Sequence, residues 1–177
     1  WRRFIPHFAR IVQPLRDKLK KEGFTPDFST EQVKAFQTLN RLLQEDPVLR
    51  HPNFSRPFEV HSDASKHAMG AALIQRDNDN KPYAVAYFSK SFNDAQQNYS
   101  TPEQETFALL TALELWKPYL YPMRVKAVID SEALRHMLKP NTKYSGRQLR
   151  WLLRLSAFSL DVEHRKGDKH IVPDMLS

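Results

Sequence analysis

The sequence predicts an α/β fold in which a five-stranded mixed sheet is flanked by helices and preceded by a helical segment. Beyond residue 57, the sequence has three short strand-like runs with turn-forming residues between them, and the first run alternates apolar and polar residues. This pattern is typical of antiparallel strands. A long helical pattern then separates these runs from a further strand, and such an order requires a crossover between parallel strands. The sheet is therefore expected to combine three antiparallel strands with parallel ones.

Residues 1–50 are expected to be helical, because apolar side chains recur there at helical spacing. Ser29 and Gln32 have the spacing of a capping box, which predicts the start of a second helix. Residues 51–57 are rich in turn formers and are interpreted as a linker to a domain over 58–177. The two apolar stripes consist of Phe4, Phe8, Ile11, Leu15 and Leu19, and of Val33, Phe36, Leu39, Leu42 and Leu43.

The domain that follows is predicted element by element. A polar turn is expected at 77–80, and the longest helix is expected to begin with Thr101 as its N-cap and to end at Pro118. The last residues are expected to begin a helix. The predicted strands are Phe58–Ser62, Met69–Gln75, Tyr83–Phe88, Arg124–Ile129 and Phe158–His164, and the shorter helices are Ser131–Leu138 and Gln148–Ser156.

Composition narrows the classes of function. The chain has 177 residues, of which 41% are hydrophobic, and it carries a net charge of +7, which suits a polyanionic partner such as nucleic acid. It has no cysteine and only 4 glycines, which excludes disulfide frameworks, cysteine zinc sites and Gly-rich phosphate loops. No apolar run approaches the roughly 18 residues of a membrane span. The sequence begins with Trp1 rather than an initiator Met and shows no signal peptide, so we expect a fragment of a longer polypeptide.

Four carboxylates stand at the boundaries of the predicted elements. Asp63 ends the first strand, Asp130 ends the fourth, Glu105 lies early in the long helix and Asp174 lies near the C-terminus. The carboxyl ends of neighbouring parallel strands meet at one edge of a sheet, so Asp63 and Asp130 are expected to lie close together. Clustered carboxylates repel one another unless divalent cations bind between them, and oxygen ligands suit Mg²⁺ or Mn²⁺. Two such ions can hold a phosphodiester during hydrolysis.

Each carboxylate also has an ordinary interpretation. An Asp after a strand is more often a turn former or a helix cap than a ligand. Glu105 is favoured near a helix N-terminus by the helix dipole alone, and Asp174 is compatible with an exposed position. Spacing by itself therefore leaves the metal site open.

Four sequence segments surround these carboxylates: Phe58–Ser65, Tyr99–Glu105, Ile129–Leu134 and His164–Ser177. In the same order, they resemble the catalytic motifs of the ribonuclease H domain in gypsy-type (Metaviridae-like) LTR retrotransposon and retroviral Pol polyproteins. Glu105 rather than Glu103 matches the catalytic glutamate, because the family's alanine, here Ala108, comes three residues later. Arg2–Phe8 and Pro47–Leu49 resemble the end of the reverse transcriptase thumb and the connection of these polyproteins.

The resemblance implies a ribonuclease H-like fold and endonucleolytic hydrolysis of the RNA strand of RNA–DNA hybrids, leaving 5′ phosphates. It implies two Mg²⁺ ions, replaceable by Mn²⁺, held by Asp63, Glu105, Asp130 and Asp174, with Asp63 bridging both ions. The expected partner besides the hybrid is an upstream polymerase domain in the same polyprotein, with no membrane. The expected location is the cytoplasm, within a retroelement particle, with the nucleus as an alternative.

Several residues are candidate substrate contacts, and a few depart from the family pattern. Ser131 replaces the more frequent His of gypsy-type elements, but Asp-Ser is usual in cellular ribonucleases H. His170 replaces Asn and is the nearest candidate for the mobile catalytic histidine of cellular enzymes, and Pro173 replaces Ala. The candidate contacts are Ser65, Lys66, Asn98, Ser131, Arg147, Arg150 and His170.

Two alternative functions remain at this point. The first is a catalytically silent ribonuclease H-like module, captured from a retroelement, that binds nucleic acid or acts as a scaffold. The second is a related fold acting on DNA, as in integrases and resolvases. Those enzymes share the carboxylates but lack the motifs at Arg2–Phe8 and Tyr99–Glu105.

Overall fold

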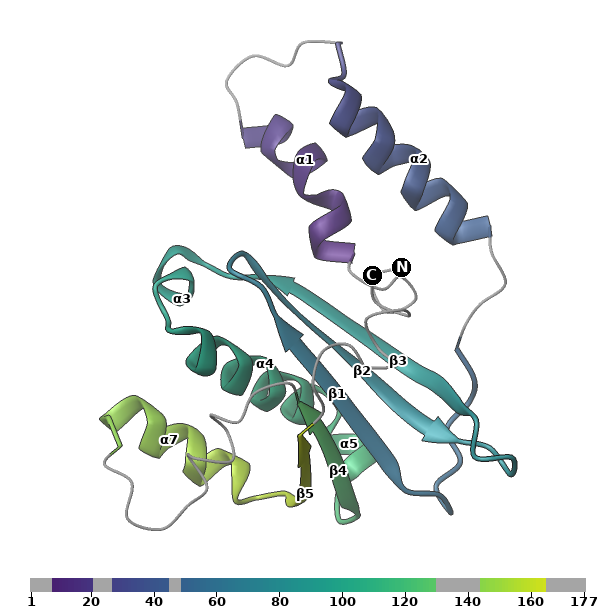
Figure 1. Cartoon of the computed structure of the whole chain (residues 1–177), viewed down its shortest axis with the longest axis vertical. Helices are drawn as coiled ribbons and strands as arrows, with labels where there is room; N and C mark the ends of the chain where they lie inside the picture. Colours follow the sequence, from purple (N-terminus) through teal and green to yellow (C-terminus); the bar gives the residue numbers. More distant parts are fainter. Residues whose placement is uncertain (1–7, 21–26, 45–48, 130–143, 165–177) are drawn as a thin grey trace.

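The computed structural model describes residues 8–20, 27–44, 49–129 and 144–164 (Figure 1). Two helices, α1 (Phe8–Lys20) and α2 (Thr30–Gln44), lie side by side before the sheet. The predicted capping box is confirmed: Ser29 N–H donates to Gln32 Oε1 at 2.9 Å, and Gln32 N–H donates to Ser29 Oγ at 3.3 Å. Leu19 and Phe36 are 78% and 58% exposed, so their spacing predicted helices but not buried positions.

Five strands form one mixed sheet in the order β3-β2-β1-β4-β5. β1 pairs antiparallel with β2, and β2 antiparallel with β3, whereas β1–β4 and β4–β5 are parallel pairs. The mixed sheet and the pairing of the first and fourth predicted strands are thus confirmed. The strands are β1 (Phe58–Ala64), β2 (Ala68–Arg76), β3 (Pro82–Ser91), β4 (Arg124–Ile129) and β5 (Ser159–His164).

The polar turn between β2 and β3 forms as predicted. Asp77 Oδ1 accepts hydrogen bonds from the N–H groups of Asp79 at 3.1 Å and Lys81 at 2.9 Å. Asn80 has φ 61°, the left-handed conformation that Asn tolerates better than most residues. Local side-chain chemistry therefore closes this hairpin.

Among the described residues after the first strand, the helices are α3 (Asp94–Gln97), α4 (Thr101–Leu115), α5 (Lys117–Leu120) and α7 (Gly146–Leu155). The predicted N-cap of α4 is wrong, because Ser100 rather than Thr101 occupies that position. Ser100 has an extended backbone and its N–H donates to Glu103 Oε2 at 3.1 Å, completing a capping box. α3 and α5 were not predicted, since four residues are too few to show a helical period. No described helix is long and apolar enough to cross a membrane.

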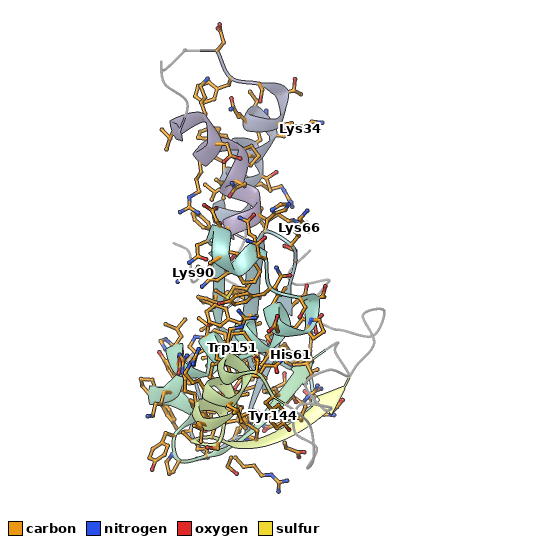
Figure 2. All side chains as sticks on the ribbon, turned by 90° about the vertical axis from the view of Figure 1, so that its left-hand side faces the viewer. Lys34, His61, Lys66, Lys90, Tyr144 and Trp151 are labelled. Atoms are coloured by element: carbon orange, nitrogen blue, oxygen red, sulfur yellow. The ribbon has the colours of Figure 1, made fainter. Side chains whose placement is uncertain are left out.

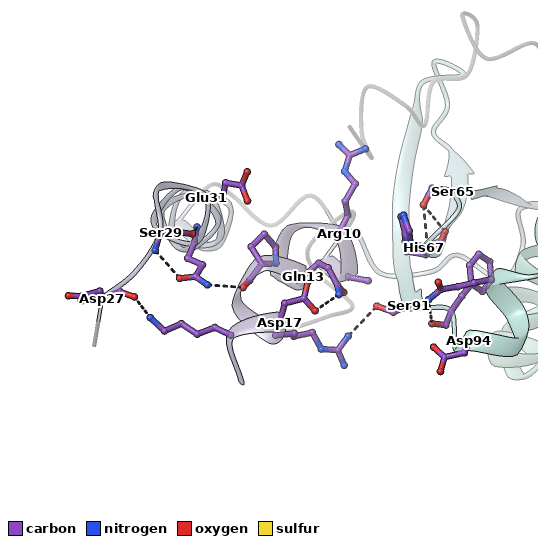
Figure 3. A pocket seen from close by; sticks show the side chains of 18 residues that line it. Arg10, Gln13, Asp17, Asp27, Ser29, Glu31, Ser65, His67, Ser91 and Asp94 are labelled. Atoms are coloured by element: carbon purple, nitrogen blue, oxygen red, sulfur yellow. Dashed lines mark hydrogen bonds between the residues drawn. The ribbon is translucent and has the colours of Figure 1, made fainter. Parts of the chain in front are cut away.

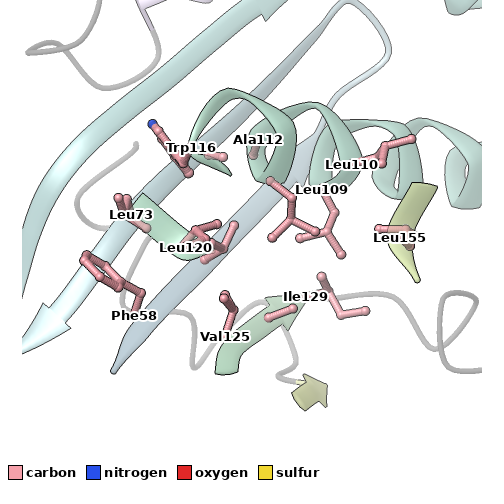
Figure 4. Packing of buried hydrophobic residues seen from close by; sticks show 14 of the residues in the cluster. Phe58, Leu73, Leu109, Leu110, Ala112, Trp116, Leu120, Val125, Ile129 and Leu155 are labelled. Carbon is pink, nitrogen blue, oxygen red and sulfur yellow. The ribbon is translucent and has the colours of Figure 1, made fainter. Parts of the chain in front are cut away.

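The main core lies between α4 and one face of the sheet (Figure 4). Phe58 of β1 and Leu109 of α4 are both fully buried, and Trp151 of α7 is 4% exposed. Each such side chain contributes about 1.5–3 kcal/mol of burial free energy. Leu109 lies one helical turn after Glu105, so the packing that buries Leu109 also turns Glu105 toward the sheet.

Asn53 and Arg56 are hydrogen-bonded to the sheet through Gln75, which is fully buried. Its Nε2 donates to the carbonyls of Asn53 at 2.8 Å and Arg56 at 3.1 Å. Its Oε1 accepts from Asn53 N–H at 2.9 Å and from Tyr83 Oη at 3.1 Å. One buried amide therefore holds most of the segment predicted as a linker against β2.

Replacing Gln75 with Leu is expected to lower the free energy of unfolding by about 2–3 kcal/mol, because the Asn53 N–H and two carbonyls would lose their partners. Urea denaturation would measure this loss. Gln13→Leu is the matched control, since Gln13 makes an exposed hydrogen bond to Asp17. Its expected change is within about 0.5 kcal/mol. Equal losses in the two variants would contradict the role given to Gln75.

Candidate active site

Asp63 lies near the end of β1 and is exposed. Its neighbour across the antiparallel pair is Gly70 of β2, which has no side chain to cover the carboxylate on that side. Its Oδ1 accepts a hydrogen bond from Ala64 N–H at 2.8 Å. This carboxylate is therefore accessible to a solvent-borne ion or substrate.

Glu105 lies early in α4 and is partly buried, with its Oε2 shielded from solvent. The residues beside it bond in other directions: Gln104 Nε2 donates to Gln96 O at 3.3 Å, and Thr106 Oγ1 donates to Pro102 O at 2.8 Å. α4 itself packs on β1, the strand that carries Asp63. Two of the four predicted carboxylates thus come from elements in direct contact.

β1 and β4 run parallel, with His61 beside Val128, and they end at the same edge of the sheet. Asp130 follows Ile129, the last residue of β4, in the sequence. The positions of Asp130, Asp174, Ser131 and His170 lie outside the described residues, so their predicted roles stay predictions. In the part of the chain that is described, no three His, Asp or Glu side chains form a group able to hold a metal.

Three of the candidate contacts, Ser65, Lys66 and Asn98, lie in the turn between β1 and β2 and at the end of α3. Ser65 Oγ donates to Ala68 O at 3.2 Å, and Asn98 Nδ2 donates to Asp94 O at 3.0 Å, so both side chains shape their own turns. Lys66 is exposed on the side of the sheet end that faces α1 and α2 (Figure 2). Unlike Ser65 and Asn98, the exposed Lys66 side chain makes no hydrogen bond to another described residue.

The arginines of α7 have different surroundings. Arg147 Nη2 donates to Glu103 Oε1 at 2.6 Å, and Arg154 Nε donates to Glu114 Oε1 at 2.7 Å. Arg150 is exposed. Burial alone would raise the pKa of Glu103, but hydrogen bonds from Arg147 and Ser100 outweigh it and lower that pKa below its ordinary value. The predicted substrate contact at Arg147 therefore already serves an internal ion pair.

A buried charged cluster on β1 was not singled out from the sequence. Glu59 and His61 are 6% and 1% exposed, and His61 Nε2 lies 2.9 Å from Glu59 Oε2. Arg76 Nε donates to Glu59 Oε1 at 2.7 Å. Burial raises the pKa of Glu59, but the bonds from His61 and Arg76 outweigh it and lower that pKa to about 2. Strand alternation places Glu59 and His61 on the sheet face of Asp63, and this signal could have revealed them.

A groove of about 1130 Å³ lies between the α1–α2 pair and the end of the sheet (Figure 3). Ala9 N–H donates to Ser89 Oγ at 3.0 Å and Arg16 Nη1 donates to Ser91 Oγ at 3.2 Å, which ties α1 to β3 along one side. Side chains of both charge signs line the groove, including Arg10 and Asp94. This mixture does not select one class of ligand.

Comparison with known proteins identifies the family. Residues 28–127, more than half of the chain, match the model of the RNase H-like domain found in reverse transcriptase. The match begins before the predicted boundary at residue 58 and includes α2. The Retrovirus-related Pol polyprotein from transposon 297 of Drosophila melanogaster is 33% identical over 178 residues, covering 100% of this chain and 16% of that protein. The Transposon Tf2-3 polyprotein of Schizosaccharomyces pombe is 33% identical over 182 residues, covering 99% of this chain and 13% of that protein.

Solved structures share the fold at low sequence identity. A foamy viral protease-reverse transcriptase dRH in complex with double-stranded DNA aligns with a TM-score of 0.71 and 17% identity, over 94% of this chain and 30% of that one. The foamy viral enzyme in complex with RNA/DNA hybrid aligns at 0.66 and 17% identity, over 94% and 23%. LC11-RNase H1, isolated from compost, aligns at 0.50 and 17% identity, over 68% and 91%.

The predicted ribonuclease H-like fold is thus confirmed, as is the resemblance to retrotransposon Pol polyproteins. The chain spans less than a fifth of the curated relatives it matches. It belongs to the family of RNase H-like domains found in reverse transcriptases, and its relatives are transposon Pol polyproteins.

Proposed function

We propose that this domain is a ribonuclease H that cuts the RNA strand of RNA–DNA hybrids endonucleolytically during reverse transcription of a retroelement. The observation that carries the proposal is the packing of α4, which carries Glu105, on β1, which carries Asp63. Asp63 is open to solvent at the end of β1, while Glu105 is turned toward the same sheet by the packing of α4. The upstream polymerase domain of the same polyprotein is the proposed partner.

The described carboxylates fit a divalent metal. Asp63 and Glu105 offer hard oxygen ligands, which suit Mg²⁺ and its substitute Mn²⁺. We propose that Asp130 and Asp174 complete the ligand set for two ions. When bound, such ions lower the pKa of the attacking water and stabilise the departing 3′ oxygen, leaving a 5′ phosphate. The exposure of Asp63 leaves room for a phosphodiester, and Glu105 Oε2 is shielded from solvent.

The hybrid would be selected by the shape of its groove and by its 2′ hydroxyls, with weak sequence preference. Exposed basic side chains are suited to hold its phosphates, and Lys66 beside Asp63 and Arg150 on α7 are the proposed ones. Binding should therefore weaken as the salt concentration rises.

The test is incubation of the purified chain with a labelled RNA–DNA hybrid, with and without Mg²⁺ or Mn²⁺, beside a labelled DNA duplex. Metal-dependent cuts confined to the RNA strand would support the proposal, and cleavage of the DNA duplex would favour an integrase-like reaction instead. Tight hybrid binding without cleavage would favour the catalytically silent module. If neither occurs, the same assay on the chain joined to its polymerase decides, and inactivity there would contradict the proposal.

A further inference from the structure

We propose that Arg147 is a positioning residue for Glu105. It ties α7 to the turn of α4 that carries Glu105, and so holds that carboxylate in place for its metal. The inference rests on the proposed function, because it assumes that Glu105 is a metal ligand. Arg147 then has an internal structural role and is not a substrate contact.

The contact between the helices runs through Glu103, two residues before Glu105. Arg147 Nη2 donates to Glu103 Oε1 at 2.6 Å. The other oxygen of the same carboxylate accepts from Ser100 N–H at 3.1 Å and from Ser100 Oγ at 3.0 Å. Glu103 therefore joins the N-cap of α4 and the first turn of α7 in one hydrogen-bonded unit.

The Arg147 side chain also lies over aromatic rings. Its guanidinium carbon lies 4.2 Å from the centroid of the Tyr99 ring and 5.7 Å from that of Trp151. Its Nε is shielded from solvent and has no hydrogen-bond partner among the described residues. Tyr99 in turn packs on Trp151 and Phe107, with ring centroids 5.6 and 6.1 Å apart. The guanidinium is thus committed to Glu103 and to the Tyr99 ring, although 39% of the side chain is exposed.

The geometry of a helix connects this ion pair to the candidate site. Successive residues are about 100° apart around an α-helix, so Glu103 and Glu105 point to nearly opposite sides of α4. Glu103 is directed to α7, and Glu105 is directed to the sheet. Rotation or fraying of this first turn would move both carboxylates together, so fixing Glu103 restrains Glu105.

The same two helices supply a matched control. Arg154 of α7 bonds Glu114 of α4 through Nε at 2.7 Å, and this pair is more exposed than the first. Glu114 lies nine residues beyond Glu105, roughly 13 Å further along the helix axis. Loss of either ion pair weakens the contact between α4 and α7, but only the loss of Arg147 releases the turn that carries Glu105.

The experiment compares Arg147→Met and Arg154→Met with the unchanged chain. Methionine keeps the apolar stem and removes the guanidinium in both variants. Mn²⁺ binding is measured from the electron paramagnetic resonance signal of the free ion, with the hybrid present, and kcat and KM are measured for its cleavage. We expect Arg147→Met to raise the Mn²⁺ midpoint about tenfold and to lower kcat by a similar factor, the range typical of groups that orient a metal ligand. KM should stay unchanged, and Arg147→Lys should recover part of the loss.

Each other outcome counts against the inference in a distinguishable way. Equal Mn²⁺ midpoints in the two methionine variants would show that Arg147 is a packing residue only. A raised KM with an unchanged midpoint would make Arg147 a substrate contact instead. An unchanged chain that binds Mn²⁺ without cutting the hybrid would contradict the proposed function, while the midpoints would still decide the role of Arg147. No saturable Mn²⁺ binding at all would overturn both.

Discussion

Replacing Asp63 with asparagine is expected to abolish metal-dependent hydrolysis while the fold stays intact. Groups that merely orient metal ligands change activity about 10- to 100-fold when removed, so loss of a proposed metal ligand should reduce kcat by at least about a thousandfold. Asp63 is exposed at the end of β1, and asparagine can still accept the bond from Ala64 N–H. Cleavage of a labelled hybrid at saturating Mg²⁺ measures the effect.

The thermal midpoint of the metal-free Asp63→Asn variant should be equal to or slightly above that of the unchanged chain. Replacing one carboxylate removes electrostatic repulsion between the predicted metal ligands. Bound Mg²⁺ would already offset this repulsion, so the substitution should not raise the midpoint when Mg²⁺ is present. Asp79→Asn is the matched control, because Asp79 is an exposed aspartate in the turn between β2 and β3. Cleavage by Asp63→Asn at the unchanged rate, from a host lacking its own ribonuclease H, would rule out this site.

Replacing Glu59 with glutamine is expected to produce the largest loss of stability at neutral pH. The pKa of Glu59 is lowered from 4.5 to about 2 in the folded chain. A carboxylate with a lowered pKa stabilises the fold above its unfolded pKa, and this contribution is lost as the pH falls toward its folded pKa. The lowering corresponds to about 3 kcal/mol, present at pH 7 and lost progressively between about pH 5 and pH 2.

Urea denaturation from pH 7 down to pH 2 would measure this effect. The Glu59→Gln variant should be less stable at pH 7 and should lose less stability on acidification, because the group that protonates is absent. Glu114→Gln provides the comparison, since the bond of Glu114 to Arg154 is exposed and its loss is expected to change stability by no more than about 1 kcal/mol. If the free energy of unfolding fell equally on acidification in the unchanged chain and in Glu59→Gln, the role assigned to the buried cluster would be contradicted.

The predictions that held came from patterns contained within one element. The fourth strand was predicted at the bounds that β4 has, Arg124–Ile129, and the turn at Asp77 was predicted from its own polar residues. Alternation, capping and turn chemistry act over a few neighbouring residues, so they can be seen in the sequence. The N-cap of α4 failed because Ser100 and Thr101 are both suitable caps, and the backbone conformation decided between them.

The candidate site also combines features predicted from the sequence with features that only the structure shows. The motif around Asp63 identified a carboxylate at a strand end, and the motif around Glu105 distinguished it from Glu103. In the structure Glu103 bonds Arg147 of α7, while α4 packs Glu105 toward the sheet. The catalytic roles of Asp63, Glu105, Asp130 and Asp174 stay predictions.

By itself, the sequence determined the class of fold, the order of the strands along the chain and the family of the domain. The tertiary structure decided which polar side chains are internal. Arg147 meets a partner 44 positions away, Arg76 meets one 17 positions away, and Gln75 bonds a segment 22 positions away. No periodic pattern encodes such pairs, because their energy depends on burial and on the meeting of distant elements after the sheet has formed.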